Sequence, residues 1–126
     1  MRGKVSTAVT TGVALLLGMF VTADAASVRV RCEKRADRSK ISVDGNDLAA
    51  GSYTATVTSG ANTKTAGAKT AVGDEVEFDF DSKANDVAAG ATSISPSFIQ
   101  GDVTGSILNA SGATVASSTV GCRVKN

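Results

Sequence analysis

The chain has 126 residues, of which 20% are charged and 4% are aromatic, with a formal net charge of +1, two cysteines and no histidine. The absence of histidine excludes Ser-His-Asp triads, imidazole metal ligands and histidine-based acid–base catalysis.

The beginning of the chain has the three parts of a secretory signal peptide: a charged start, a short apolar run and a small-residue cleavage site. Arg2 and Lys4 precede the apolar run 13–21, and Ala23 and Ala25 form the A-x-A pattern. The apolar run is well short of the roughly 20 residues that span a bilayer. We therefore predict a signal peptide at 1–25, export to the periplasm or the cell exterior, no membrane span, and one domain at 26–126.

Two basic residues and one acidic residue belong to that leader, so the 13 basic and 12 acidic residues of the whole chain leave 11 of each in the predicted domain. A neutral domain lacks the basic surface that nonspecific nucleic-acid binding requires. We expect no nucleic-acid partner.

Most of the predicted domain alternates apolar and polar residues with period two, which is typical of strands with one buried face. In stretch 28–35, Val30 and Cys32 share the inward face, while Arg29 and Arg31 share the outward face. The predicted strands, in chain order, are 28–35, 39–43, 52–58, a weaker 63–70, 75–81, 103–109, 113–120 and 120–126. Seven or eight short strands with turns between them predict an all-β fold, an antiparallel β-sandwich.

Turn signals separate these strands. Asp44-Gly45 is a strong turn dipeptide, 59–62 predicts a second turn, and 110–112 predicts a hairpin. Segment 82–100, which contains the single proline of the chain, lacks the strand pattern. We expect it to cross between the two sheets, with a short helical turn near 84–89.

The two cysteines lie near opposite ends of the predicted domain, Cys32 in the first strand and Cys122 in the last. In an oxidising compartment an even pair predicts a disulfide, and two cysteines allow one intramolecular pairing. An intermolecular bridge and two free thiols are the alternatives. Both cysteines are predicted to face inward, with Val120 and Val124 beside Cys122, so that the bridge ties the two chain ends to one core.

Segment 48–57, LAAGSYTATV, resembles the L-x-x-G-x-Y-x-x-x-V segment of bacterial immunoglobulin-like and transthyretin-like sandwiches. Segment 105–120 is similar to the strand-turn-strand opening of the carboxypeptidase-regulatory-like group within them. The resemblance implies a β-sandwich that acts as a noncatalytic adhesive, accessory or linking module. We expect Tyr53 to be a core tyrosine with a hydrogen-bonded hydroxyl.

The best candidate for chemistry is an acidic row on one face of strand 75–81, formed by Glu75, Glu77, Asp79 and Asp81. It has three interpretations: charge pairing with basic residues across neighbouring strands, an exposed solubilising face, or a calcium site. Same-face neighbours on a strand stand roughly 7 Å apart, which is unfavourable for ligands of one ion. The expected basic partners are Arg29, Arg31, Lys34, Arg35, Arg123 and Lys125. A second acidic stretch, 44–47, is interpreted as a plain turn, with calcium as the alternative.

These features predict a small exported β-sandwich that serves as a binding or structural accessory module, with no catalysis, cofactor or resident metal. The first alternative is a self-assembling surface component, in which complementary acidic and basic strands pair between copies. The second is a calcium-responsive module. The expected partner is another protein or a surface, and the expected state is a monomer or a weak homo-oligomer.

Overall fold

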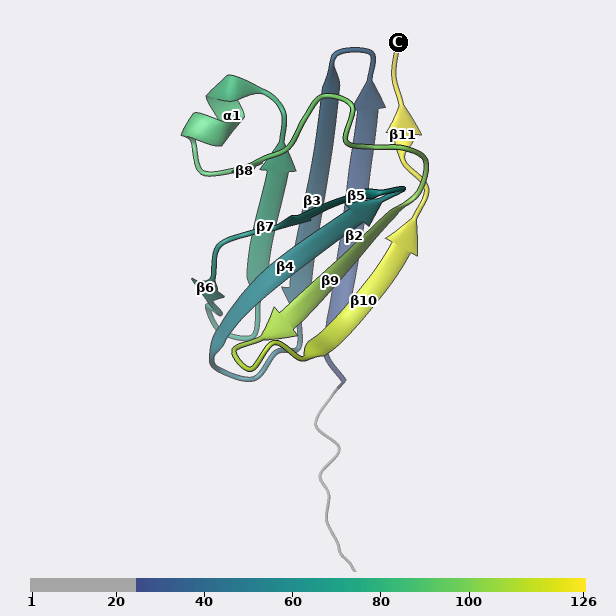
Figure 1. Ribbon diagram of the computed structural model, residues 1–126. Helices are drawn as coiled ribbons and strands as arrows, with labels where there is room; N and C mark the ends of the chain where they lie inside the picture. Colours follow the sequence, from purple (N-terminus) through teal and green to yellow (C-terminus); the bar gives the residue numbers. More distant parts are fainter. Residues whose placement is uncertain (1–24) are drawn as a thin grey trace, which may run out of the picture.

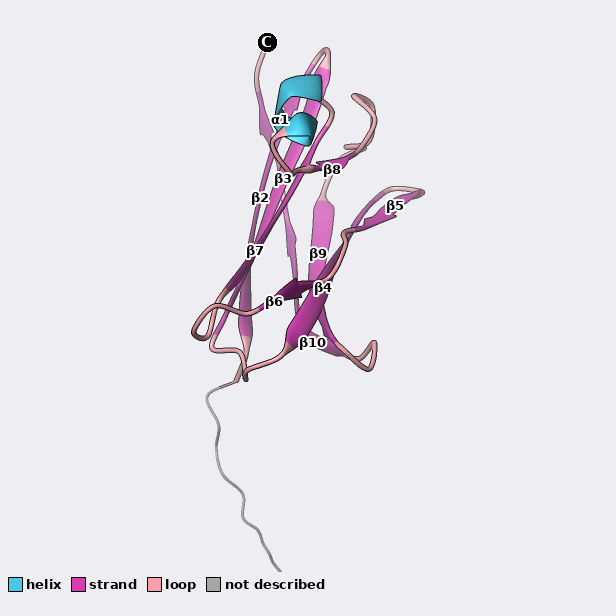
Figure 2. Cartoon of the chain, turned by 90° about the vertical axis from the view of Figure 1, so that its left-hand side faces the viewer, coloured by secondary structure: helices cyan, strands magenta, loops and turns pink. Residues whose placement is uncertain are grey.

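The computed structural model describes residues 25–126, and the predicted signal peptide up to residue 24 lies outside the described residues. Two sheets pack face to face across one apolar core, which confirms the predicted β-sandwich (Figures 1 and 2). The strands are β2 (Ser27–Arg35), β3 (Arg38–Asn46), β4 (Ser52–Ser59), β5 (Asn62–Thr65), β6 (Lys69–Thr70), β7 (Val76–Asp81), β8 (Thr92–Ser93), β9 (Val103–Asn109), β10 (Thr114–Val120) and β11 (Arg123–Val124).

The first sheet has the strand order β11-β2-β3-β7-β8, and the second has the order β10-β9-β4-β5, with β6 also paired to β4. All pairs are antiparallel except β11 with β2 and β7 with β8. The strands β6, β8 and β11 have two residues each. Strands β6 and β11 lie within the predicted strands 63–70 and 120–126, whereas β8 lies in segment 82–100, where the pattern predicts no strand. The seven longer strands correspond to the predicted ones.

The core is formed by the inward residues of the alternating strands. The most deeply buried large side chains come from both sheets: Ile41, Val43, Phe78 and Phe80 from the first, and Val57, Val103 and Ile107 from the second. Tyr53 is also buried, and its hydroxyl donates a hydrogen bond to the carbonyl oxygen of Ala49 at 2.7 Å, as predicted.

The predicted turn at Asp44-Gly45 is wrong, because β3 continues through both residues to Asn46. The chain turns afterwards, at 47–51, where Asp47 has a φ of 58°. Gly45 meets a packing requirement instead of a turn requirement. A Cβ atom there would lie 3.1 Å from Cδ1 of Leu48, closer than carbon atoms normally approach.

Gly105 on β9 has a similar role where the two sheets face each other. A Cβ atom at this position would lie 2.7 Å from Cγ2 of Val30 and 3.1 Å from Cγ2 of Val43, both on the opposite sheet. The optimal separation of two carbon atoms is about 3.5–4.0 Å. The absence of a side chain at Gly105 therefore lets β9 pack closely on β2 and β3.

Segment 82–100 crosses from the first sheet to the second, as predicted (Figure 1). It contains the short helix α1 (Ala84–Ala88), followed by β8 at the edge of the first sheet. Its apolar residues Ile94, Phe98 and Ile99 are buried in the core.

Two buried serines satisfy backbone groups of this crossing segment. On β3, the Ser39 hydroxyl donates to the carbonyl oxygen of Pro96 at 2.7 Å and accepts from the amide of Ile99 at 3.3 Å. At the end of β4, the Ser59 hydroxyl accepts from the amide of Gln100 at 2.7 Å. Buried backbone groups outside regular structure need such partners, so each sheet holds one part of the crossing chain.

The predicted disulfide is present: Cys32 on β2 is bonded to Cys122, with 4.8 Å between the two Cα atoms. Cys122 lies between β10 and β11, where the chain returns from the second sheet to the first. Both cysteines pack partly buried against the core. The predicted inward position of Val124 is wrong. Its side chain is 71% exposed, because β11 only extends the edge of the first sheet.

We predict that Gly105→Ala destabilises the fold by about 1–3 kcal/mol, the usual effect of adding a methyl group to a well-packed core. Urea denaturation of the purified protein measures this change. Gly67→Ala is the matched control, because a Cβ atom at Gly67 meets no atom within 4 Å. Val30→Ala combined with Gly105→Ala should recover part of the loss. Equal denaturation midpoints for the two single variants would contradict the packing role of Gly105.

Candidate functional site

The outward residues of the first sheet form a charged face. Register pairs them across β2, β3 and β7 in three rows: Arg29–Asp44–Glu77, Arg31–Ser42–Asp79 and Glu33–Lys40–Asp81. We use the name charged face for these nine residues. Strand β3 lies between the basic strand β2 and the acidic strand β7. The expected direct pairing of the acidic row with the basic residues of β2 is therefore wrong.

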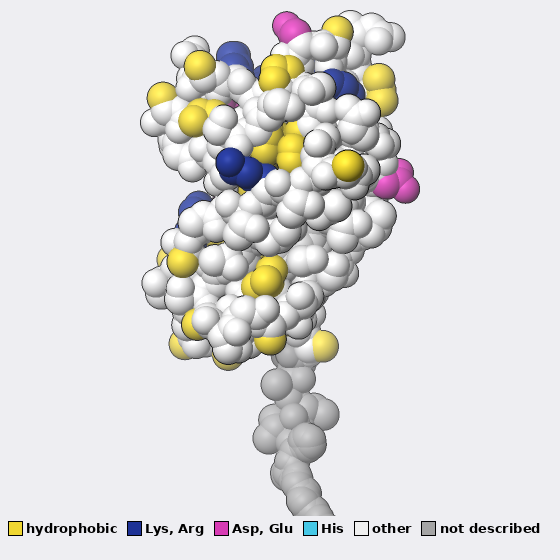
Figure 3. Space-filling view, viewed as in Figure 1, with side chains coloured by type: hydrophobic (Ala, Val, Ile, Leu, Met, Phe, Trp, Pro, Cys, Tyr) yellow, Lys and Arg dark blue, Asp and Glu magenta, His cyan; other side chains and the backbone are white. Residues whose placement is uncertain are grey.

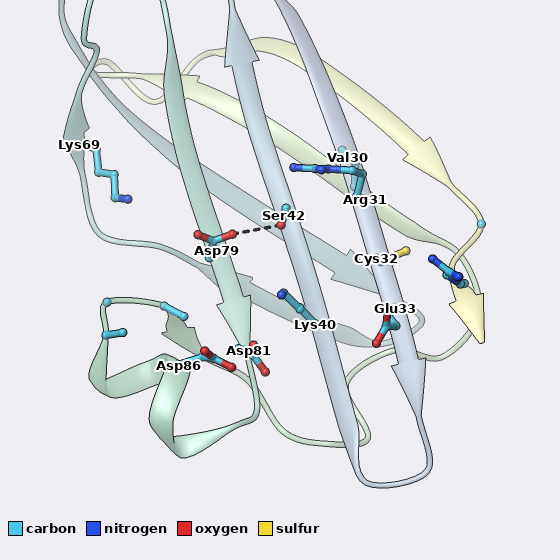
Figure 4. Close-up of a pocket in the computed structure, with 15 residues that line it drawn as sticks. Val30, Arg31, Cys32, Glu33, Lys40, Ser42, Lys69, Asp79, Asp81 and Asp86 are labelled. Atoms are coloured by element: carbon cyan, nitrogen blue, oxygen red, sulfur yellow. Dashed lines mark hydrogen bonds between the residues drawn. The ribbon is translucent and has the colours of Figure 1, made fainter. Parts of the chain in front are cut away.

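Contacts on this face run between neighbouring strands. Arg31 of the second row forms a diagonal ion pair with Asp44 of the first row at 2.9 Å. Within the second row, the Ser42 hydroxyl donates to Asp79 at 3.1 Å (Figure 4). In the second and third rows, opposite or neutral groups are neighbours, whereas in the first row Asp44 and Glu77 place two like charges side by side. Each favourable pair contributes only about 0.2–1 kcal/mol, and the like pair in the first row opposes them.

The end of the face near the disulfide is extended by β11, whose Arg123 pairs in register with Glu33. Glu33 accepts a hydrogen bond from Arg35 at 2.7 Å and lies 3.8 Å from the ammonium group of Lys125. The hydrogen bond from Arg35 is the main reason that the pKa of Glu33 lies below its ordinary value. Arg123 and Lys125 therefore lie beside β2 and not beside the acidic strand.

Three of the four acids of the predicted row, Glu77, Asp79 and Asp81, lie on the charged face, but their exposure differs. Glu75 precedes β7, Glu77 and Asp79 are exposed on it, and Asp81 is 1% exposed. Within residues 25–126, no three carboxylates or cysteines are arranged to hold a metal ion. Asp44 and Asp47, from the second acidic stretch, belong to β3 and to the following turn. The described geometry gives no support to the calcium interpretation of either stretch.

Asp81 is buried because Arg38 and helix α1 cover it. The guanidinium of Arg38 donates two hydrogen bonds to Asp81, at 3.0 and 2.7 Å, and a third to Asp86 of α1 at 2.6 Å. The backbone amide of Lys83 also donates to Asp81 at 3.0 Å. These bonds attach α1 to the end of β7 and β3. Neither Arg38 nor its bond to Asp86 could be found from the sequence, since no periodic pattern links these positions.

The pKa of Asp81 reflects two opposing effects. Burial would raise it, but the hydrogen bonds from Arg38 and from the Lys83 amide outweigh burial, so the pKa lies below the ordinary value of 3.8. The same pairing with Asp81 raises the pKa of Arg38. Both groups are therefore charged at neutral pH, and the buried carboxylate is compensated.

A hollow of about 790 Å³ lies over the charged face beside the loop that follows α1. Figure 4 shows its labelled side chains, which come from β2, β3, β6, β7 and α1. Its walls carry both signs of charge: the basic residues include Arg31, Lys40 and Arg123, and the acidic ones include Asp79 and Asp86. Among the described residues, Lys40 has no carboxylate within 4.0 Å. The hollow thus offers an ammonium group and an exposed carboxylate to a ligand.

The outer face of the second sheet has a different character. Its outward side chains on β4, β5, β9 and β10 include eight hydroxyl residues, which we name the hydroxyl face: Thr56, Thr58, Thr63, Thr65, Thr104, Ser106, Ser117 and Thr119. They pair across strands, for example Thr104 with Thr119 at 2.7 Å and Ser106 with Ser117 at 2.9 Å. Figure 3 shows this side with few charged groups.

Comparison with known proteins identifies no family. No family model matches the chain, and no curated protein matches it. Among solved structures, a β-glucosidase from Kluyveromyces marxianus in complex with glucose matches with a TM-score of 0.39 and 8% sequence identity. The match covers 78% of this chain but only 13% of the enzyme, and a similarity this weak carries no conclusion about function. Within residues 25–126, no helix is long and apolar enough to cross a membrane.

We predict that Asp81→Asn lowers the free energy of unfolding by about 1–3 kcal/mol at pH 7, because it removes a charge-assisted hydrogen-bond acceptor. This loss is smaller than the loss expected when a fully buried ion pair is broken. Arg38 is 19% exposed, and in the variant it still forms its ion pair with Asp86. The folded-state pKa of Asp81 lies below its unfolded value. Its contribution is therefore complete above about pH 4 and is lost as the pH falls through the folded value.

Denaturation curves between neutral and strongly acidic pH test this prediction. The difference between the wild type and Asp81→Asn should shrink as Asp81 becomes protonated. Asp79→Asn, on the same strand but exposed, is the control and should change stability by less than about 0.5 kcal/mol. A difference that stays constant over the whole pH range would show that the carboxylate charge is not the cause.

Proposed function

We propose that this chain is an exported, noncatalytic β-sandwich module of the immunoglobulin-like class that binds its partner through the charged face and the hollow above it. The observation that carries this proposal is the hollow of about 790 Å³, which exposes Lys40 and Asp79 on a rigid sheet. Sites built on strands hold their side chains more firmly than sites on loops.

The strand arrangement supports the immunoglobulin-like class. The first, second and fifth long strands (β2, β3 and β7) form one sheet, and the third, fourth, sixth and seventh (β4, β5, β9 and β10) form the other. This division is similar to that of immunoglobulin-like sandwiches. The chain differs from antibody domains in having no tryptophan and in its disulfide, which joins β2 to the segment after β10.

A binding role is supported over catalysis by the groups present in the hollow. Both cysteines are bonded to each other, and the chain has no histidine. The buried carboxylate, Asp81, has a lowered pKa and is fully hydrogen-bonded, which is the opposite of a general acid prepared to donate a proton. Charged groups held in fixed rows suit recognition of a complementary surface.

Export is supported by the disulfide, because such bonds persist in oxidising compartments. We predict that expression of the full chain in a bacterium yields protein outside the cytoplasm that begins near Ala26. Intact-mass analysis should show both cysteines unavailable to alkylation without reductant. Full-length, alkylatable protein confined to the cytoplasm would contradict export.

The binding surface is tested with a peptide of alternating lysine and glutamate. Its glutamates can pair with Lys40 in the hollow, and its lysines can pair with Asp79. We expect NMR titration of the exported protein to shift the amide signals of Arg31, Lys40 and Asp79. Lys40→Ala should weaken binding, whereas Lys64→Ala, which changes an exposed lysine on the other sheet, should not. A neutral Gly/Ser peptide is the ligand control. Shifts confined to the second sheet, or no shifts, would overturn the proposed site.

A further inference from the structure

The charged face is divided into a basic and an acidic side. In its first two rows, the β2 side carries Arg29 and Arg31, and the β7 side carries Glu77 and Asp79. All four side chains belong to exposed residues. Among the described residues, Arg31 is the only one of the four with an ion-pair partner within 4.0 Å, and that partner is Asp44 on the middle strand.

These opposite charges cannot neutralise each other within one molecule. Strands β2 and β7 are separated by β3, so their backbones lie two strand spacings apart, about 10 Å. This distance is close to the Debye length at physiological ionic strength, roughly 8 Å, so that salt screens most of the attraction. The face therefore keeps a basic side and an acidic side that are both available to a second body.

We propose that two copies of this protein associate through their charged faces, around a two-fold axis parallel to β3. This inference rests on the proposed function, in which the charged face is the binding surface, and it names the partner as a second copy. A two-fold axis along the strands places β2 of one copy over β7 of the other. Arg29 then faces Glu77 of the partner subunit, and Arg31 faces the partner's Asp79, each contact occurring twice.

The alternative two-fold axis, in the same plane but across the strands, places β2 over β2 and β7 over β7. That arrangement brings like charges together, which costs several kcal/mol in a contact of this kind. The chosen arrangement also places β3 over β3, where Asp44 faces the partner's Asp44, but each Asp44 is already paired with Arg31 of its own copy. The charges of the outer strands thus select the first of the two arrangements. The hollow lies over the second and third rows, so water remains between the copies around Lys40. The ion pairs between the copies come from the outer strands of the first two rows.

The contact is small and charged, which predicts a weak dimer. Three strands and two rows provide much less than the roughly 1,200–2,000 Å² that stable interfaces bury. Association should therefore depend strongly on ionic strength, because exposed ion pairs are screened by salt.

Sedimentation velocity of the exported protein over a range of concentrations tests the dimer at ionic strengths of about 0.01 M and 1 M, where the Debye length is roughly 30 and 3 Å. We expect dimers at the low value and monomers at the high value. In the first two rows, Arg29→Glu with Arg31→Glu makes both outer strands acidic, and Glu77→Lys with Asp79→Lys makes both outer strands basic. Each double variant alone should be monomeric, with an affinity lower by more than roughly a hundredfold.

An equimolar mixture of the two double variants should form a heterodimer, since their faces have opposite charge. Lys64→Glu, on the second sheet, is the control and should dimerise like the wild type. If a double variant fails to fold, Arg29→Gln and Glu77→Gln should each weaken the dimer at low salt. A wild type that is monomeric at low ionic strength overturns the inference, as does a mixture that stays monomeric. The peptide titration reads the binding site independently, so failure of the dimer is distinguishable from failure of the proposed function.

Discussion

The disulfide between Cys32 and Cys122 joins the two sheets at the place where the chain returns from one to the other. It closes a loop of 90 residues, for which the chain-entropy model allows a stabilisation of at most about 4–5 kcal/mol. Domains of this size have total stabilities of about 5–15 kcal/mol. The described core contains only three phenylalanines and no tryptophan, so this covalent bond contributes a large share of the net stability.

A close approach of the sheets adds to this constraint. Gly45 and Gly105 lie on opposite sheets, and each leaves space for apolar side chains that a Cβ atom would displace. Small residues thus compensate for a scarcity of large ones, since a thin core can be well packed only if the sheets come close. The buried serines Ser39 and Ser59 also connect the two sheets, because each forms a hydrogen bond with the crossing segment 82–100 from a different sheet.

Much of this architecture could be predicted from alternation alone. The seven longer strands, the hairpin at 110–112, the crossing segment and the disulfide follow from period, turn residues and compartment. The partition of strands between sheets could not be predicted, because alternation identifies a buried face without identifying its neighbours. For that reason β3 was not expected between the basic and acidic strands. The role of Arg38 was also hidden, since its partners Asp81 and Asp86 are more than forty residues away. The sequence predicts a turn at Gly45 because it does not distinguish a glycine that packing requires from a glycine that a turn requires.

The two outer surfaces of the sandwich differ in how strongly they respond to dissolved salt. The hydroxyl groups that pair across β4, β5, β9 and β10 are neutral, do not titrate near physiological pH, and are indifferent to dissolved ions. The opposite surface carries arginine, lysine, aspartate and glutamate, whose interactions weaken as salt increases. A change in the salt concentration of the surrounding medium therefore alters the electrostatic interactions of one side of this molecule and leaves those of the other side nearly unchanged.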